Sequence, residues 1–310
     1  MGKDVKCGIF GLAVADALGV PVEFKERTAL REDPVMDMRG KGTHHQPKGT
    51  WSDDTSMTLC LADSLSTGGV NYDDIMDRFC RWWIGGEYTP HGYAFDIGGA
   101  TGRALSRFRE GSPPLLCGGR NERDNGNGAL MRILPAAYIA RSVPIDKCMD
   151  IVHSLTTLTH AHPRALIASG IYVRICIALL EGKSPSDAVS RALTECRVYY
   201  QTGAHADELC HYERLMNGIA QLREEEIRSS GYVVDTLEAA VWCLLNTGNY
   251  RDCVLKAVNL GDDTDTVAAV AGGMAGICYG YADIPSEWLR SLARSDIIET
   301  VCGLFQKQIG

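Results

Sequence analysis

The chain has 310 residues, of which 45% are hydrophobic and 23% are charged, a balance typical of soluble globular proteins. Its net charge of -8 argues against nonspecific binding to nucleic acid or to an anionic membrane, and we expect neither as a partner. The longest apolar candidate, residues 267–281, is shorter than the ~20 residues needed to cross a bilayer, so we expect no membrane-spanning segment.

From the N-terminus onward, apolar residues recur mostly at helical spacing. No run of alternating or β-branched residues demands a sheet, and no linker, low-complexity tract or clear repeat interrupts the pattern. The sequence therefore predicts an all-α fold of about a dozen helices and one domain over residues 1–310. Helices are expected at residues 8–19, directly after residue 52, and at 73–84, 100–109, 129–135, 145–158, 164–181, 186–196, 207–227, 236–246, 250–259, 267–280, 286–294 and 297–308.

The first predicted helix, residues 8–19, alternates small residues with larger apolar ones, which allows other helices to approach it closely. Pro21 ends this helix. Glu23 follows, and from the local residues alone it could equally be a solvated acid after a turn. The predicted helix at 164–181 is apolar on most sides, so we expect it in the middle of the fold.

An acid cluster, Ser52-Asp53-Asp54, stands at the start of a helix whose buried face carries Met57 and Leu61. Ser and Asp are preferred capping residues, and acids favour the positive end of a helix dipole, so capping is the plain explanation. One acid satisfies a cap, however. Two acids flanked by hydroxyls, in a pattern that returns near the C-terminal end, exceed what capping requires.

The second acid cluster, residues 262–266, precedes the small-residue helix predicted at 267–280. Two carboxylates ~4 Å apart repel by about 1 kcal/mol in water and by several times that in a partly dry site. Ligand atoms that are all oxygen suit a hard cation such as Mg²⁺ or Mn²⁺. We therefore predict a hard cation at this cluster. If the two clusters share one site, the chain must close into a single compact body around it.

A long loop, residues 111–127, runs into a glycine-rich stretch before the helix predicted at 129–135. Loops of this length in compact domains are usually functional or disordered. Free backbone N–H groups at a helix start make an anion site, and the guanidinium of Arg132 suits phosphate. The stretch consists of Asn125, Gly126, Asn127 and Gly128.

Two histidine pairs and twelve cysteines offer softer ligands. His44 and His45 are adjacent in a polar loop. Adjacent side chains rarely point toward the same metal ion, so we do not expect a metal there. His160 and His162 would make the site softer than the acids suggest, and we expect substrate contact from them. With no Cys-x-x-Cys pair and no secretory signal at residues 1–8, we expect reduced cysteines and a cytoplasmic monomer.

Taken together, these motifs resemble the ADP-ribosylglycohydrolases, which include the dinitrogenase reductase-activating glycohydrolases, over nearly the whole chain. The departures from the family pattern are Ala15, Ser52, Gly99 and Asp262, where Gly, Thr, Asn and Gly are often found. The residues that carry the resemblance are 16–19, 21–24, 51–55, 95–98, 125–132, 159–160 and 261–266.

The resemblance implies an orthogonal multi-helix bundle with two Mg²⁺ or Mn²⁺ ions in a central cleft. It places Asp96 beside the scissile ribose and Glu23 as a mobile acid near the metals. The implied metal ligands, drawn from both acid clusters, are Ser52, Asp53, Asp54, Asp263, Asp265 and Thr266. Asp262 is not among them, so we expect Asp262→Gly to be tolerated. The implied catalytic carboxylates are Glu23, Asp53, Asp54 and Asp263. The implied contacts to the diphosphate and the adenosine half are Asn125, Gly126, Asn127, Gly128, Met131, Arg132 and His160.

The implied activity is metal-dependent hydrolysis of the glycosidic bond at C1″ of ADP-ribose, which removes ADP-ribose from modified protein side chains or related compounds. Likeness to the dinitrogenase reductase type favours arginine-linked substrates, while serine-linked and small O-linked substrates stay open. Residues 85–92 and 111–123, expected at the lip of the cleft, would determine which linkage is cleaved. A metal pair can bind a ribose diol and activate water, and a carboxylate can move the proton. The alternatives are a two-metal phosphoester hydrolase and a non-catalytic ADP-ribose-binding protein, and the intact acid clusters argue against the latter.

Overall fold

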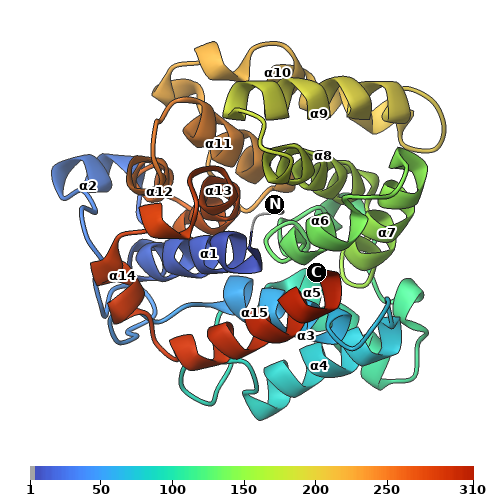
Figure 1. Cartoon of the computed structure of the whole chain (residues 1–310), viewed down its shortest axis with the longest axis horizontal. Coiled ribbons are helices and arrows are strands. Elements are labelled where there is room, and N and C mark those ends of the chain that lie inside the picture. Colours follow the sequence, from blue (N-terminus) through green and yellow to red (C-terminus); the bar gives the residue numbers. More distant parts are fainter. Residues whose placement is uncertain (1–3) are drawn as a thin grey trace.

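The computed structural model describes residues 4–310, and within this range the chain forms fifteen α-helices and no β-strand (Figure 1). The predicted all-α fold is confirmed. Residues 1–3, part of the stretch inspected for a secretory signal, lie outside the described residues. The helices are α1 (Val5–Gly19), α2 (Arg27–Glu32), α3 (Asp53–Leu65), α4 (Tyr72–Gly85), α5 (Gly99–Arg109), α6 (Leu134–Ala140), α7 (Ile145–Thr157), α8 (Pro163–Leu180), α9 (Pro185–Tyr200), α10 (Glu213–Met216), α11 (Val233–Leu245), α12 (Tyr250–Val258), α13 (Thr264–Tyr279), α14 (Ser286–Ser291) and α15 (Ser295–Ile309).

Helices α1 and α13 pack antiparallel along their length, because glycines remove the side chains that would hold them apart. A Cβ on Gly276 would lie 2.0 Å from the carbonyl oxygen of Cys7, near the start of α1. At the other end, a Cβ on Gly19 would lie 2.3 Å from the Cα of Asp265. Neither approach is sterically possible for a larger residue. The small residues of the two predicted helices therefore bring the start of α13 against the end of α1.

Helix α8 is buried on nearly all sides and contacts α6, α7, α9, α11 and α13, which confirms its predicted place in the middle of the fold. Two segments, Val5–Val22 and Pro163–Leu180, are long and apolar enough by length and composition to span a membrane. Both are longer than residues 267–281, so the expectation that those residues form the longest apolar candidate is wrong. Both are about nine-tenths buried within the fold, as core helices are, and such helices pass the same test without a membrane.

Two predicted helices differ from the structure. Residues 129–132 form turns, and α6 begins only at Leu134, where Pro135 suits the first turn of a helix. The helix predicted at 207–227 is replaced by 3₁₀ segments and the four-residue α10. Gly218, with a φ of 118°, interrupts this region, since that backbone conformation is outside any right-handed helix.

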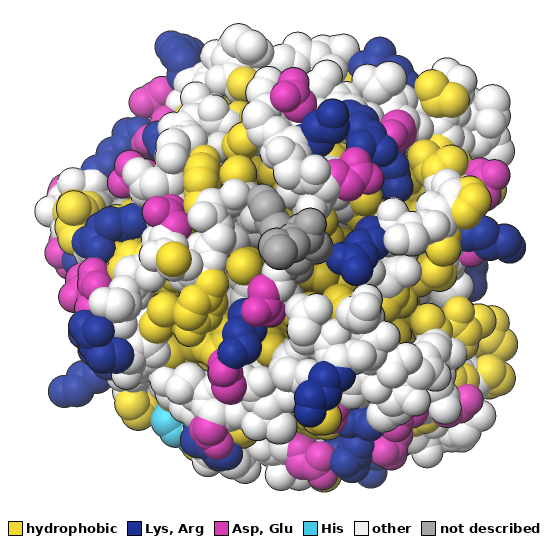
Figure 2. Space-filling view, viewed as in Figure 1, with side chains coloured by type: hydrophobic (Ala, Val, Ile, Leu, Met, Phe, Trp, Pro, Cys, Tyr) yellow, Lys and Arg dark blue, Asp and Glu magenta, His cyan; other side chains and the backbone are white. Residues whose placement is uncertain are grey.

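The burial of the cysteines and the mixed charge of the surface are those of an ordinary globular protein. All twelve cysteines lie in the described part of the chain, ten of them are buried, and none forms a disulfide within it. The buried apolar side chains form one contiguous cluster. On the face drawn in Figure 2, basic and acidic side chains are interspersed and do not gather into regions of one sign.

Candidate active site

The two acid clusters meet where the N-termini of α3 and α13 reach the end of α1. Carboxylate oxygens of Asp16, Asp54 and Asp265 lie within 4.8 Å of one another, and all three side chains are fully buried. A second group within the same distance joins Asp263 and Asp265 to Glu23. The structure thus brings together acids that are far apart in the sequence.

Asp16 holds the start of α3 against α1. Its carboxylate accepts hydrogen bonds from the backbone N–H of Ser52 at 3.0 Å, from that of Thr55 at 3.1 Å, and from the Thr55 hydroxyl at 2.6 Å. Burial raises the pKa of Asp16 to about 6, against the opposing effect of these hydrogen bonds. Sequence analysis did not assign Asp16 to the site. Its only signal was an acid within an otherwise apolar, small-residue helix.

Two buried carboxylate oxygens, Asp54 Oδ1 and Asp265 Oδ2, have no hydrogen-bond partner among residues 4–310. Burial and then neighbouring carboxylates raise the pKa of Asp53, Asp54 and Asp265 well above the usual range. A buried acceptor without a partner costs roughly 1–3 kcal/mol, and more when it is charged. A divalent cation would satisfy both oxygens, so the residues present fit a hard metal ion.

Hydroxyl groups complete this oxygen-rich cluster. The hydroxyls of Ser52 and Thr266 donate to the same oxygen, Asp54 Oδ2, at 3.0 and 3.3 Å. Ser52 also caps α3, since its Oγ accepts from the backbone N–H of Asp54. The capping explanation is therefore confirmed for this residue, and its hydroxyl also contacts a carboxylate of the acid cluster.

A cleft of about 420 Å³ opens onto the acid cluster. Ser52, Asp54 and Asp265 are buried and do not line it. Asn125 does not line it either. The predicted residues that do line the cleft are Glu23, Asp53, Asp96, Gly126, Asn127, Gly128, Met131, His160, Asp263 and Thr266.

The glycine-rich turn is tied to the acids and to His160. The Asn127 side-chain amide donates to Asp263 Oδ2 at 2.9 Å. A Cβ on Gly128 would lie 3.0 Å from His160 Cε1 and 3.1 Å from the Thr101 hydroxyl, so only glycine fits without displacement. Burial lowers the pKa of His160 to about 3, which keeps its imidazole neutral.

Arg132 lies behind the cleft and does not line it. Its guanidinium donates to the carbonyl oxygens of Gly128 at 2.6 Å and Leu155 at 3.2 Å, and it lies over the Phe79 ring. Burial lowers the pKa of Arg132 to about 9. In this arrangement the expected contact between the guanidinium and a diphosphate is not available, and Arg132 instead supports the turn at Gly128.

Two other arginines, Arg103 and Arg123, do line the cleft. Arg103 pairs with Asp124 at 2.8 Å, and Arg123 is exposed. Sequence analysis missed both, because single arginines in a helix or a loop carry no spacing signal. Of the residues expected at the lip, 85–92 and 111–123, only Arg123 is among those that line the cleft.

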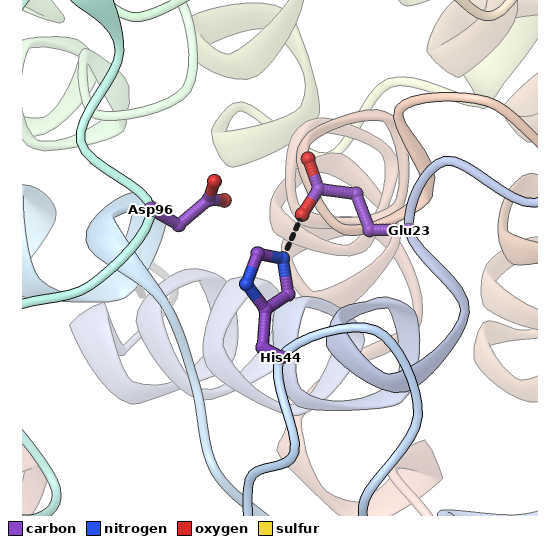
Figure 3. A group of neighbouring side chains, drawn as sticks. All are labelled: Glu23, His44 and Asp96. Carbon is purple, nitrogen blue, oxygen red and sulfur yellow. Dashed lines mark hydrogen bonds and ion pairs between the residues drawn. The ribbon is translucent and has the colours of Figure 1, made fainter.

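Glu23, Asp96 and His44 converge from three segments of the chain (Figure 3). His44 Nε2 contacts Glu23 Oε2. Burial, followed by the charge of Asp263, raises the pKa of Glu23 to about 8. Burial, followed by the charge of Glu23, raises the pKa of Asp96 to about 8. Asp96 also has a φ of 59°, a left-handed conformation that is uncommon for a residue other than glycine and often marks functional sites.

A larger hollow of about 620 Å³ lies on the other side of Phe24, which lines both spaces. Its Arg27 is already bonded to backbone carbonyls, including that of Leu260 at 2.7 Å. Asp262 lines this hollow, is exposed, and has a φ of 64°. Its position agrees with the expectation that Asp262 lies apart from the other acids of its cluster. The buried carboxylates mark the smaller cleft as the reactive one.

The protein is an all-α body in which two helix N-termini and a glycine-rich turn enclose a carboxylate-lined cleft, an arrangement typical of a reactive site. The family model described as ADP-ribosylglycohydrolase matches residues 4–309, and the chain belongs to that family. The resemblance drawn from the motifs is thus confirmed. The protein is an enzyme of the ADP-ribosylglycohydrolase type.

Relatives with named activities agree with this assignment. The chain is 36% identical over 299 residues to "ADP-ribosylarginine hydrolase Tri1" of Serratia proteamaculans, covering 96% of this chain and 77% of that protein. It is 32% identical over 286 residues to the "ADP-ribosyl-[dinitrogen reductase] glycohydrolase" of Rhodospirillum rubrum, covering 91% and 87%. A solved structure titled "ADP-ribosylglycohydrolase-related protein complex" superposes with a TM-score of 0.82 at 32% identity, covering 99% of this chain and 98% of that one.

Proposed function

We propose that this enzyme hydrolyses the bond between C1″ of ADP-ribose and an arginine side chain. The observation that carries the proposal is the meeting of the two acid clusters beside the cleft. Two relatives above 30% identity are named for arginine-linked or dinitrogen reductase-linked ADP-ribose, which favours the arginine linkage over serine and other linkages. We also propose that the chain works as a single-domain monomer in the cytoplasm, supported by its contiguous core and by the absence of a disulfide within residues 4–310.

We propose Mg²⁺ or Mn²⁺ as the cofactor. The supporting observations are the all-oxygen donor set and the two buried carboxylate oxygens without partners. When bound, a divalent pair supplies Lewis acidity and lowers the pKa of a water molecule. The residues that would hold the ions are Ser52, Asp53, Asp54, Asp263, Asp265 and Thr266.

The reaction forms a bond between a water oxygen and C1″ and breaks the bond between C1″ and the guanidine nitrogen. The water loses a proton, and the leaving guanidine gains one, so the products are ADP-ribose and arginine. Glu23 and Asp96 line the cleft next to the acid cluster, where a carboxyl group can accept and deliver these protons. We assign the proton transfer to Glu23, and we place Asp96 beside the ribose.

We place the diphosphate and the adenosine half in the part of the cleft formed by the glycine-rich turn. The turn at Gly126–Gly128 lines it together with Met131 and His160, and Arg103 and Arg123 add positive charge. Charge-assisted hydrogen bonds from guanidinium groups are the strong kind for phosphate. The cleft therefore offers carboxyl groups for the ribose and guanidinium groups for the phosphates.

A panel of substrates tests the proposal. ADP-ribosylarginine, ADP-ribosylserine and a phosphate ester would be incubated with the enzyme in Mg²⁺, in Mn²⁺ and in EDTA, and free ADP-ribose quantified. We expect release from the arginine conjugate in the presence of a divalent ion. Asp53→Ala and Asp265→Ala should abolish it, while Asp262→Gly, at the neighbouring acid, should retain it. Turnover of the phosphate ester alone would refute the proposal.

A further inference from the structure

The loop at residues 41–46 is fixed onto the segment that carries Glu23. A Cβ on Gly42 would lie only 1.8 Å from the carbonyl oxygen of Pro21, so the two backbones touch. The backbone N–H of Thr43 donates to the same carbonyl at 3.1 Å, and the Thr43 hydroxyl donates to the carbonyl oxygen of Glu23 at 2.6 Å. The loop therefore cannot shift without moving the backbone of Glu23.

This loop places the His44 ring against the Glu23 carboxylate (Figure 3). The ring also contacts two aromatic side chains: its centroid lies 5.3 Å from that of Phe95 and 6.2 Å from that of Phe24. The Gln46 amide donates to the His44 carbonyl oxygen at 3.2 Å. Backbone, ring packing and side-chain contact thus agree on one position for the imidazole.

Glu23 needs such a partner because its side chain has several rotatable bonds and lies among like charges. One of its oxygens lies within 4.8 Å of Asp263 and Asp265, and one lies within the same distance of Asp96. Repulsion from these carboxylates would push a free Glu23 side chain towards solvent. Of these neighbours, His44 alone offers a ring N–H.

We propose that His44 is a positioning residue for Glu23. Its Nε2–H donates to Glu23 Oε2 and restricts the carboxylate to one orientation, which leaves the other oxygen available to the cleft. Partners that orient a catalytic or ligating group typically change activity roughly 10–100-fold when they are removed. His44 itself does not line the cleft, so its removal should affect the chemical step more than substrate binding.

The adjacent histidine provides a matched control. His45 is the same type of residue as His44 and lies in the same loop, but its side chain is exposed and its φ is 55°. Asn tolerates this left-handed conformation, so His45→Asn keeps the backbone unstrained. For His44, Ala removes the donor, whereas Gln keeps an N–H donor on a side chain of similar reach.

The test rests on the proposed function and measures kcat and KM for ADP-ribosylarginine together with Mg²⁺ affinity by calorimetry. We expect His44→Ala to lower kcat roughly 10–100-fold, with KM and Mg²⁺ affinity within about 2-fold of wild type. His44→Gln should recover much of the loss, and His45→Asn should match wild type.

Wild-type kcat in His44→Ala would overturn the assignment. A parallel loss of kcat, substrate affinity and Mg²⁺ affinity would also overturn it, because a general structural role would explain that pattern. So would a Gln variant no better than Ala. A wild-type enzyme that releases no ADP-ribose refutes the proposed function itself, which the His44 variants cannot do.

Discussion

Asp265→Asn should stabilise the metal-free protein while it removes the response to metal. Asp265 is fully buried, and its carboxylate lies within 4.8 Å of those of Asp16 and Asp54. Two unit charges at that distance repel by about 3–4 kcal/mol at an effective dielectric constant of 20. Protonation relieves part of this repulsion, as the raised pKa of Asp265 indicates, so we expect a net gain of ~1–3 kcal/mol in the free energy of unfolding.

The gain should depend on pH. Because folding raises the pKa of these carboxyl groups, the folded state binds more protons than the unfolded state, and wild-type stability falls as pH rises. The difference between the variant and the wild type should therefore be larger at pH 8 than at pH 5. The amide also supplies a donor near the unpartnered oxygen of Asp54.

Thermal unfolding in EDTA and in Mg²⁺ measures both effects. In EDTA the variant should melt above the wild type; in excess Mg²⁺ the wild type should gain stability by mass action and the variant should not. Asp262→Asn, at the exposed acid in the same cluster, is the matched control and should behave as wild type. A variant that melts below the wild type in EDTA, or that gains as much from Mg²⁺, would refute the electrostatic reasoning.

Three further substitutions test separate parts of the site. Asp262→Gly should leave activity unchanged and keep the free energy of unfolding within ~1 kcal/mol, because glycine suits the φ of 64°; loss of turnover would place Asp262 in the chemistry. Gly19→Ala should cost ~1–3 kcal/mol in a chemical denaturation experiment and weaken Mg²⁺ binding, since its Cβ would collide with the backbone of Asp265; wild-type Mg²⁺ affinity would contradict the close-packing argument. Arg123→Ala should raise KM for ADP-ribosylarginine roughly 10-fold at constant Tm, while Arg120→Ala, an exposed arginine in the same loop that does not line the cleft, should not; equal effects would argue against a phosphate contact.

Helical periodicity predicted most of the fold, because an apolar stripe at helical spacing needs a core whatever its neighbours are. It failed where local chemistry decides. Residues 129–132 are three apolar residues followed by Arg132, yet they form turns, and the Arg132 guanidinium donates to the carbonyl oxygen of Gly128. Residues 207–227 contain many charges and Gly218, and tertiary contacts leave them as short 3₁₀ segments.

The acid clusters were visible in the sequence because a helix cap needs only one acid or hydroxyl, and each cluster has several side by side. The residues that place them were not. Asp16 acts through hydrogen bonds to residues far along the chain, and His44 reaches Glu23 only because Gly42 lies against Pro21. The burial of Arg132 likewise depends on contacts between segments that are distant in the sequence. Sequence patterns therefore indicated the chemistry of the site better than the residues that hold its side chains in place.

We propose that this cleft cleaves the bond at C1″ and leaves the diphosphate intact. Proton NMR of the product mixture from ADP-ribosylarginine in Mg²⁺ is the decisive measurement, since it identifies the bond that breaks. We expect ADP-ribose and free arginine in equal amounts, with no reaction in EDTA or with Asp265→Ala. Release of AMP with ribose phosphate still attached to arginine would contradict it.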